Sequence, residues 1–217
     1  MAYLGKTLRG IGSTMVMTMF FALVFGPPAL VVATEVENLH LGVTKDCGDG
    51  KTYTKLGPKW GSFPVSYSVT PASGANADAI RRGFVTWDAE EHPAGAFYTE
   101  QSGSGQNIDV SFGPIDGSGG TLAQTSYSYN RFTKKFIEVN IVFDSAESWA
   151  NYAGLSCSSQ GSGVDVEAVA VHEIGHGNGI GHSSSSTALS LYPFYGSGAT
   201  HQRTLATGDA KGLDALY

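Results

Sequence analysis

The chain has 217 residues, of which 41% are hydrophobic and 15% are charged, and its formal net charge is −6. This balance excludes an intrinsically disordered chain, and the length fits a single domain after any leader is removed. The 13 basic residues form no cluster, so we expect no nucleic-acid partner.

The first 33 residues have the pattern of a secretory signal peptide. Lys6 and Arg9 precede an apolar run over residues 11–25, and Val31 and Ala33 suit a cleavage site. We therefore predict a signal peptide over 1–33, an extracellular protein, and no stable membrane association after cleavage. An uncleaved signal anchor is the alternative, because the apolar run can span a bilayer if its two prolines are tolerated. All four methionines lie in this segment, so the mature chain has none.

The segment 34–57 contains Cys47, and the second cysteine is Cys157. Two cysteines in an exported protein suggest a disulfide, which in the simple chain-entropy model would stabilise the fold by about 4–5 kcal/mol. The alternative is that Cys47, within Asp46-Cys47-Gly48, is a thiolate that caps a metal in a latent precursor.

The remaining chain, 58–217, is predicted to fold as one α+β domain, because strand patterns come first and helices follow. Alternating polar and apolar residues predict the strands, and apolar residues at helical spacing predict the helices. The expected strands cover residues 62–70, 96–100, 107–112, 122–129 and 137–143, and the expected helices cover 75–91, 164–178 and 206–217.

Residues 172–182, HEIGHGNGIGH, carry the strongest functional signal. His172 and His176 are four apart on a predicted helix, so their rings project from one face and can share an ion. Gly179 lets the backbone leave the helix, and His182 returns as a third ligand. Three neutral nitrogens with one open position are typical of catalytic zinc. Glu173, beside the first ligand, is placed to take a proton from metal-bound water. The other histidines, at 40, 92 and 201, are expected in loops or at the surface.

The extended motif HExxHxxGxxH resembles that of the metzincin clan of zinc endopeptidases, and Ser183 after the third histidine is similar to the matrixins. The resemblance covers about residues 58–217. Residues 114–125 resemble the matrixin calcium loop and the edge strand that follows it, and residues 143–149 keep the family's Phe-Asp, Glu and Trp spacing. Residues 192–195 resemble the wall of the S1′ pocket, and residues 205–217 resemble the C-terminal helix. The resemblance implies a metzincin-type catalytic domain. Such a domain has a twisted, mostly parallel small sheet with one antiparallel edge strand, an active-site helix and a C-terminal helix.

The resemblance also implies site residues for a monomeric enzyme that hydrolyses extended polypeptides. Glu173 would be the general base, with one zinc, because Gln124 and Val142 stand at positions of the family's second zinc site. Calcium is expected as a structural ion. Its ligands would be Asp116, Asp144 and Glu147, and the substrate would be bound by Leu122, Ala123, Thr125, Pro193 and Tyr195.

Two positions depart from the matrixin pattern. Leu191 or Ser190 stands where the clan has a methionine beneath the metal, and Leu can fill that volume at little cost. Gly208 replaces the acidic neighbour of Asp209, so we expect no salt bridge there to the mature N-terminus. The alternative function is a non-catalytic secreted metal-binding or adhesive module on the same scaffold.

Overall fold

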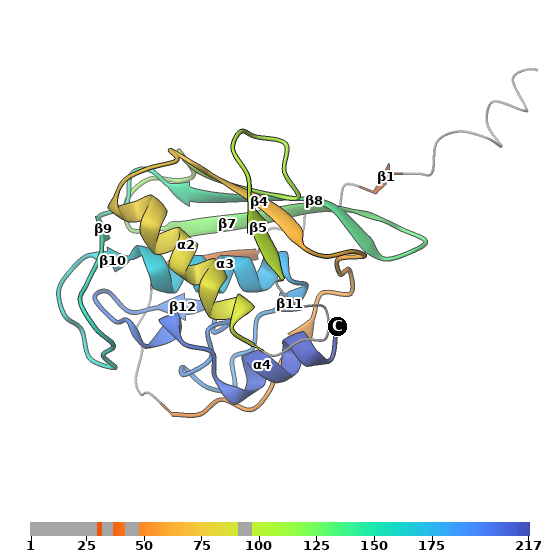
Figure 1. Ribbon diagram of the computed structural model, residues 1–217. Helices are drawn as coiled ribbons and strands as arrows, with labels where there is room; N and C mark the ends of the chain where they lie inside the picture. Colours follow the sequence, from red (N-terminus) through yellow and green to blue (C-terminus); the bar gives the residue numbers. More distant parts are fainter. Residues whose placement is uncertain (1–29, 32–36, 42–47, 91–96) are drawn as a thin grey trace, which may run out of the picture.

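A computed structural model describes residues 30–31, 37–41, 48–90 and 97–217 of the chain. A twisted sheet forms one layer, and the helices α2 (Ala75–Asp88) and α3 (Val166–Gly177) lie against one of its faces (Figure 1). The helix α4 (Thr207–Asp214) lies on the far side of α3 from the sheet. Within the described part of the chain, no helix is both long and apolar enough to cross a bilayer.

The central strands are those that the alternating pattern predicts. They are β4 (Val65–Thr70), β5 (Tyr98–Glu100), β6 (Ile108–Gly113), β7 (Thr121–Asn130) and β8 (Lys135–Asp144). In the order β7-β8-β6-β4-β5, all neighbours are parallel except β7, which is antiparallel to β8. The predicted fold class, a mostly parallel small sheet with α3 as its central helix, is confirmed.

The helices pack closely because glycine lies at their contact. A Cβ atom added to Gly83 of α2 would come within 2.9 Å of the Cβ atom of Ala170 in α3. Helix α3 is buried on nearly all sides, because every one of its residues except Glu167 is buried. It begins where Asp165 caps it by accepting a hydrogen bond of 2.9 Å from the backbone N–H of Ala168.

The structure differs from the sequence expectation at the outer side of β7. The strand β2 (Glu37–Leu41) pairs with it antiparallel, and the short strand β12 (Phe194–Tyr195) pairs parallel with β2. Strand β7 is therefore not the edge of the sheet. The segment β1 (Leu30–Val31), within the predicted signal peptide, pairs with the other end of β7.

Short pairings complete the fold. They join β3 (Thr54–Lys55) to β11 (Ile180–Gly181) and β9 (Trp149–Ala150) to β10 (Val164–Asp165). A 3-10 helix, η1 (His201–Arg203), precedes α4. Cys47 and His92 lie outside the described residues, so the predicted Cys47–Cys157 disulfide stays a prediction.

Candidate metal centre

Helix α3 and the turn after it bring three imidazoles together. The Nε2 atoms of His172, His176 and His182 lie 3.0 to 3.2 Å from one another. His172 and His176 are fully buried on α3, and His182 is half-buried. Among the described residues, this is the one group of three or more histidine, cysteine or acidic side chains that could hold a metal ion.

Gly179 is required for the turn that returns His182. Its φ is +93°, and a Cβ atom there would lie 2.3 Å from the carbonyl oxygen of Pro58. Any other residue would be strained by the backbone conformation and would collide with fixed backbone. The predicted role of this glycine in ending the helix is thus explained by two independent constraints.

The tautomers of two rings follow from their outer hydrogen bonds. Nδ1 of His172 lies 2.6 Å from the carbonyl oxygen of Ser190, and Nδ1 of His176 lies 2.8 Å from that of Ile180. A carbonyl can only accept, so both Nδ1 atoms carry the proton and both Nε2 atoms present lone pairs. Two lone pairs facing each other at 3.0 Å repel unless a cation lies between them.

The donor set fits zinc. Tetrahedral zinc with bonds of about 2.0–2.1 Å needs ligand nitrogens about 3.3 Å apart, close to the observed spacing. Burial and the neighbouring rings His176 and His182 hold the pKa of His172 well below its usual range. That ring is therefore neutral, as a metal ligand must be.

Glu173 is held against the sheet by a residue of β7. The Thr125 hydroxyl donates a hydrogen bond of 2.5 Å to Oε2 of Glu173 and lies 3.2 Å from its carbonyl oxygen. Both side chains are fully buried. The matrixin resemblance assigned Thr125 to substrate binding. The structure adds the hydrogen bond from Thr125 to Glu173, which no local pattern in the sequence indicates.

A turn supported by Asp209 lies beneath the histidines. The Asp209 carboxylate accepts hydrogen bonds from the backbone N–H groups of Ser190 and Leu191, at 2.8 and 3.4 Å. The Ser190 carbonyl then orients His172, as described above. Leu191 is buried, and its Cδ2 atom would lie 2.7 Å from a Cβ atom on Gly175, so it fills the space under the helix.

Comparisons with known proteins agree with this geometry. The family description "Matrixin" matches residues 59–217. Human matrix metalloproteinase-16 is 32% identical over 188 residues, covering 77% of this chain and 28% of the relative. Metalloendoproteinase 1 of Glycine max is 29% identical over 205 residues, which cover 88% of this chain and 62% of the relative. Human matrilysin is 35% identical over 104 residues, which cover 48% of this chain and 34% of the relative.

The chain belongs to the matrixin family. The resemblance inferred from the zinc motif is confirmed, and the family that the chain matches is one of peptidases. It spans between about a quarter and three fifths of the length of these three relatives.

The carboxylates assigned to calcium by the matrixin resemblance bind backbone N–H groups. Asp144 accepts from Asp116 and Gly117, Glu147 accepts from Gly119 at 2.6 Å, and Asp116 itself accepts from Thr121. Burial alone would raise the pKa of Asp144, but its N–H donors lower that pKa below the ordinary value. The two loops are thus joined by these carboxylates, and calcium stays a prediction.

The remaining predicted substrate residues lie on β7 and around β12. Leu122, Ala123 and Tyr195 are fully buried, and Pro193 is half-buried. Tyr195 is fixed from two sides, because its hydroxyl accepts from the backbone N–H of Asp165 at 3.1 Å and donates to the carbonyl of Ala199. These residues therefore border the place where β2 pairs with the sheet.

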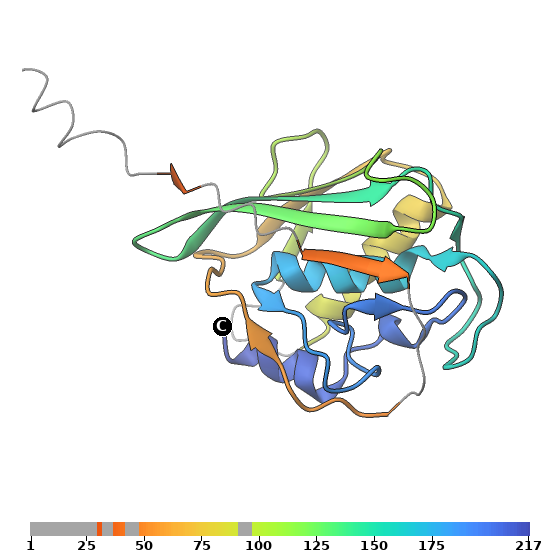
Figure 2. The ribbon, with the colours of Figure 1, turned by 180° about the vertical axis from the view of Figure 1, so that it is seen from behind.

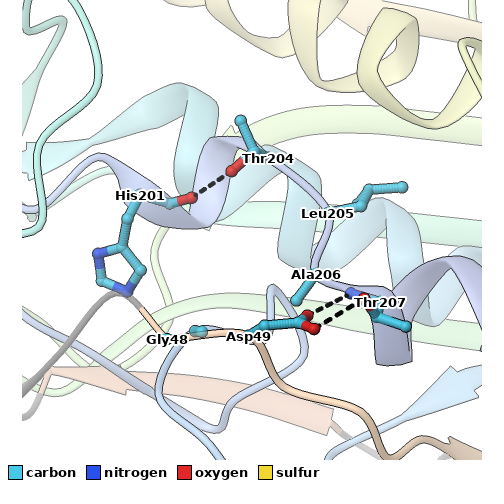
Figure 3. Close-up of a pocket in the computed structure, with 8 residues that line it drawn as sticks. Gly48, Asp49, His201, Thr204, Leu205, Ala206 and Thr207 are labelled. Atoms are coloured by element: carbon cyan, nitrogen blue, oxygen red, sulfur yellow. Dashed lines mark hydrogen bonds between the residues drawn. The ribbon is translucent and has the colours of Figure 1, made fainter.

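A hollow of about 230 Å³ lies at the start of α4, and none of the three clustered histidines lines it (Figure 3). Asp49 lines this hollow and accepts hydrogen bonds of 3.0 Å from the backbone N–H and the hydroxyl of Thr207. Those hydrogen bonds lower the pKa of Asp49. His201 also lines this hollow. It lies in η1 and is buried, so the expectation of a loop or surface histidine was wrong for this residue. Its Nε2 atom lies 2.9 Å from the carbonyl oxygen of Thr187.

Proposed function

We propose that this matrixin is a secreted zinc-dependent endopeptidase that hydrolyses peptide bonds in extended polypeptides. The observation that carries the proposal is the set of three Nε2 atoms, two of them fixed as lone-pair donors by carbonyl groups behind the rings. Such a set leaves one ligand position open for water or a carbonyl oxygen.

The chain's own residues suit each step of hydrolysis. A zinc ion held by the three histidines would supply Lewis acidity to a scissile carbonyl and to water. Glu173 takes the proton of the attacking water and then delivers it to the nitrogen of the leaving amine. The hydrogen bond from Thr125 holds the Glu173 side chain during both transfers. The carbonyls of Ser190 and Ile180 keep two rings in the ligating tautomer.

The substrate is proposed to add to the outer side of β7 by main-chain hydrogen bonds. Leu122, Ala123 and Thr125 lie on this strand, and Pro193 and Tyr195 lie at the facing wall. Strand addition recognises backbone, so side-chain preference would come from the pocket between that wall and α3. The small Ala168 on α3, which is buried, favours an open pocket there.

Replacing Glu173 tests the proposal. We expect Glu173→Gln to keep the fold and bound zinc and to lower the rate of casein cleavage about 10²- to 10⁴-fold, because the amide cannot carry the proton. Glu167→Gln is the matched control on the same helix, where Glu167 pairs with Arg82, and it should keep the rate. Unchanged proteolysis in Glu173→Gln would remove Glu173 from the mechanism.

We further propose one zinc and at least one calcium ion per chain. The calcium proposal is supported by the resemblance of residues 114–125 to the matrixin loop and by the approach of Asp144 and Glu147 to the backbone of 116–119. Elemental analysis of the purified protein measures both ions. Two zinc ions per chain would contradict the single-zinc proposal, and no calcium would contradict the loop assignment.

Secretion and the disulfide complete the proposal. Removal of residues 1–33 would place the mature N-terminus at Thr34, which N-terminal sequencing of the exported protein measures. A Cys47–Cys157 disulfide is supported by the finding that no described cysteine is a free thiol. Mass spectrometry of peptides from the unreduced protein should find these two cysteines linked.

A further inference from the structure

We propose that the tip of the β7–β8 hairpin, residues 130–135, is a docking surface for a lipid bilayer that contains anionic phospholipids. The contact is reversible, of the kind that one apolar side chain and a few cations make, and is not a stable anchor. No part of the proposed catalysis uses this tip, so the inference does not depend on the proposed endopeptidase function. Its consequence is that the enzyme gathers at lipid surfaces.

The hairpin forms an arm that extends away from the rest of the domain. Figure 2 shows the closed end between β7 and β8 projecting beyond the helices, as it also does in Figure 1. The turn is fixed by Asn130, whose Oδ1 atom accepts hydrogen bonds of 3.0 Å from the backbone N–H groups of Phe132 and Thr133. The backbone N–H of Lys134 donates to the Asn130 carbonyl at 2.8 Å. The tip is therefore a structured projection.

An aromatic side chain is exposed at this tip. Phe132 has 73% exposure, the highest value among the exposed large hydrophobic side chains of the described residues. The hydrogen bonds that fix the turn use only the backbone of Phe132, so a polar side chain at this position would serve the turn equally well. Transfer of the ring from water to an apolar phase is favourable and should raise affinity at least about tenfold.

Four basic residues share this end of the hairpin. Arg131, Lys134 and Lys135 are exposed, and Lys59, also exposed, lies opposite Lys135 in a parallel bridge. None of the ion pairs among the described residues includes any of the four. Glu138 is the acidic residue closest to the turn along either strand. This end is therefore positive although the net charge of the chain is −6. The sequence shows only three of these cations together, and the fold adds Lys59.

The backbone of Lys134 is a further observation. Its φ is +54°, the one positive value at a non-glycine position among the described residues. Glycine adopts this conformation at no steric cost and is the usual residue at such a position of a hairpin turn. The turn itself therefore gives no reason for a lysine here, whereas a role for its charge does.

A bilayer with anionic lipids matches both parts of the tip. Its phosphate groups attract the cations, and each cation near the surface should raise affinity about fivefold. Its acyl region receives the ring of Phe132. A sulfated polysaccharide would match the cations but would leave this ring in water. The bilayer is therefore the partner that uses every exposed feature of the tip.

Vesicle co-sedimentation of the exported protein tests the proposal. The probe is vesicles of phosphatidylcholine and phosphatidylglycerol at a ratio of about seven to three. We expect Phe132→Ser to raise the apparent Kd at least about tenfold and Lys134→Gly to raise it about fivefold. The parent and its variants share one N-terminus, so differences in Kd report on the tip and not on the leader.

Two exposed residues elsewhere supply matched controls. Val85 on α2 is an apolar side chain with 65% exposure, and Lys211 on α4 is an exposed cation. Val85→Ser and Lys211→Gln should keep the parent's Kd. A general loss of apolar surface or of positive charge would instead weaken these variants as much as the variants of the tip.

Thermal unfolding separates a binding role from a structural one. Glycine suits the backbone conformation at 134, so Lys134→Gly should keep or raise the Tm while it loses affinity. Phe132→Ser should keep the Tm, because the ring is exposed in the folded chain. Loss of the fold then cannot account for weaker binding.

Three outcomes would overturn the proposal. The first is that the parent does not bind the vesicles, or binds with the same Kd as Phe132→Ser and Lys134→Gly. The second is equal binding to vesicles of phosphatidylcholine alone, because charge would then play no part. The third is binding of heparin that depends on Lys134 and not on Phe132, without binding to vesicles, which would assign the tip to a sulfated polysaccharide. Casein cleavage in solution should be the same in the parent and these variants, so a failure of the endopeptidase proposal leaves this test intact.

Discussion

At the scale of single residues, the hydroxyl of Thr125 connects the sheet to the carboxylate of Glu173, the proposed general base. It lies 2.5 Å from Oε2 of Glu173, and both residues are fully buried. Thr125→Val keeps the shape of the side chain and removes the hydrogen bond, which leaves a buried carboxylate oxygen without this donor. We expect kcat for a fluorogenic peptide to fall about tenfold, with little change in KM.

Serine supplies the control at this position. Thr125→Ser keeps the hydroxyl, so its kcat should stay within about twofold of the wild-type value. Because Thr125 also pairs within the sheet, circular dichroism should confirm that both variants keep the fold. A valine variant with wild-type kcat would show that the metal site and helix α3 position Glu173 without Thr125.

At the scale of elements, the beginning of α3 depends on a buried ion pair. Nε of Arg203 in η1 lies 2.8 Å from Oδ1 of Asp165, the cap of α3, and its Nη2 also donates to the Tyr152 carbonyl. Its hydrogen bond to Asp165 raises the pKa of Arg203. Removing the guanidinium leaves a buried charge unpaired, so Arg203→Met should lower the free energy of unfolding by about 3–5 kcal/mol in urea titration.

An exposed arginine on α2 offers the comparison. Arg82 pairs with Glu167 at 2.5 Å, but half of its side chain is exposed to solvent. Arg82→Met should therefore cost less than about 1 kcal/mol. If the two variants cost the same, burial of the Asp165 carboxylate would not be what makes the Arg203 pair important.

The sequence predicted the elements whose signal is local. The alternation of polar and apolar residues over 62–70 predicted the strand β4. The motif at 172–182 predicted that His172, Glu173 and His176 lie on one helix and that His182 follows it after a turn. The sequence could not predict β2, because these five residues acquire strand structure through pairing with β7, more than 80 residues away, and with β12. The same reason hid Arg203, whose partner Asp165 lies 38 residues earlier.

At the scale of the whole molecule, residues 48–57 pack against the domain that follows them. Strand β3 pairs with β11, directly after the helix that carries the first two histidines. The carbonyl of Gly50 accepts from Gly208, and Asp49 binds the start of α4. Gly208 stands where the matrixin resemblance leads one to expect an acidic neighbour of Asp209, and the backbone of Thr52 lies against this glycine.

The pH dependence of stability should report the burial of Asp209. Burial raises the pKa of this carboxyl to about 6 from an ordinary value of 3.8, although backbone N–H donors oppose the shift. A raised carboxyl pKa means that the folded chain binds more protons than the unfolded chain between these two values. The contribution of Asp209 to stability is therefore greatest below pH 4 and declines as the pH rises through 6.

Asp209→Asn isolates this contribution, because the amide does not titrate and all other groups are shared. The free energy of unfolding of the wild type minus that of the variant should fall by up to about 3 kcal/mol between pH 4 and pH 7, measured by urea titration at each pH. A difference that is constant with pH would mean that Asp209 ionises alike in the folded and unfolded chain, and that its N–H donors from Ser190 and Leu191 fully offset its burial.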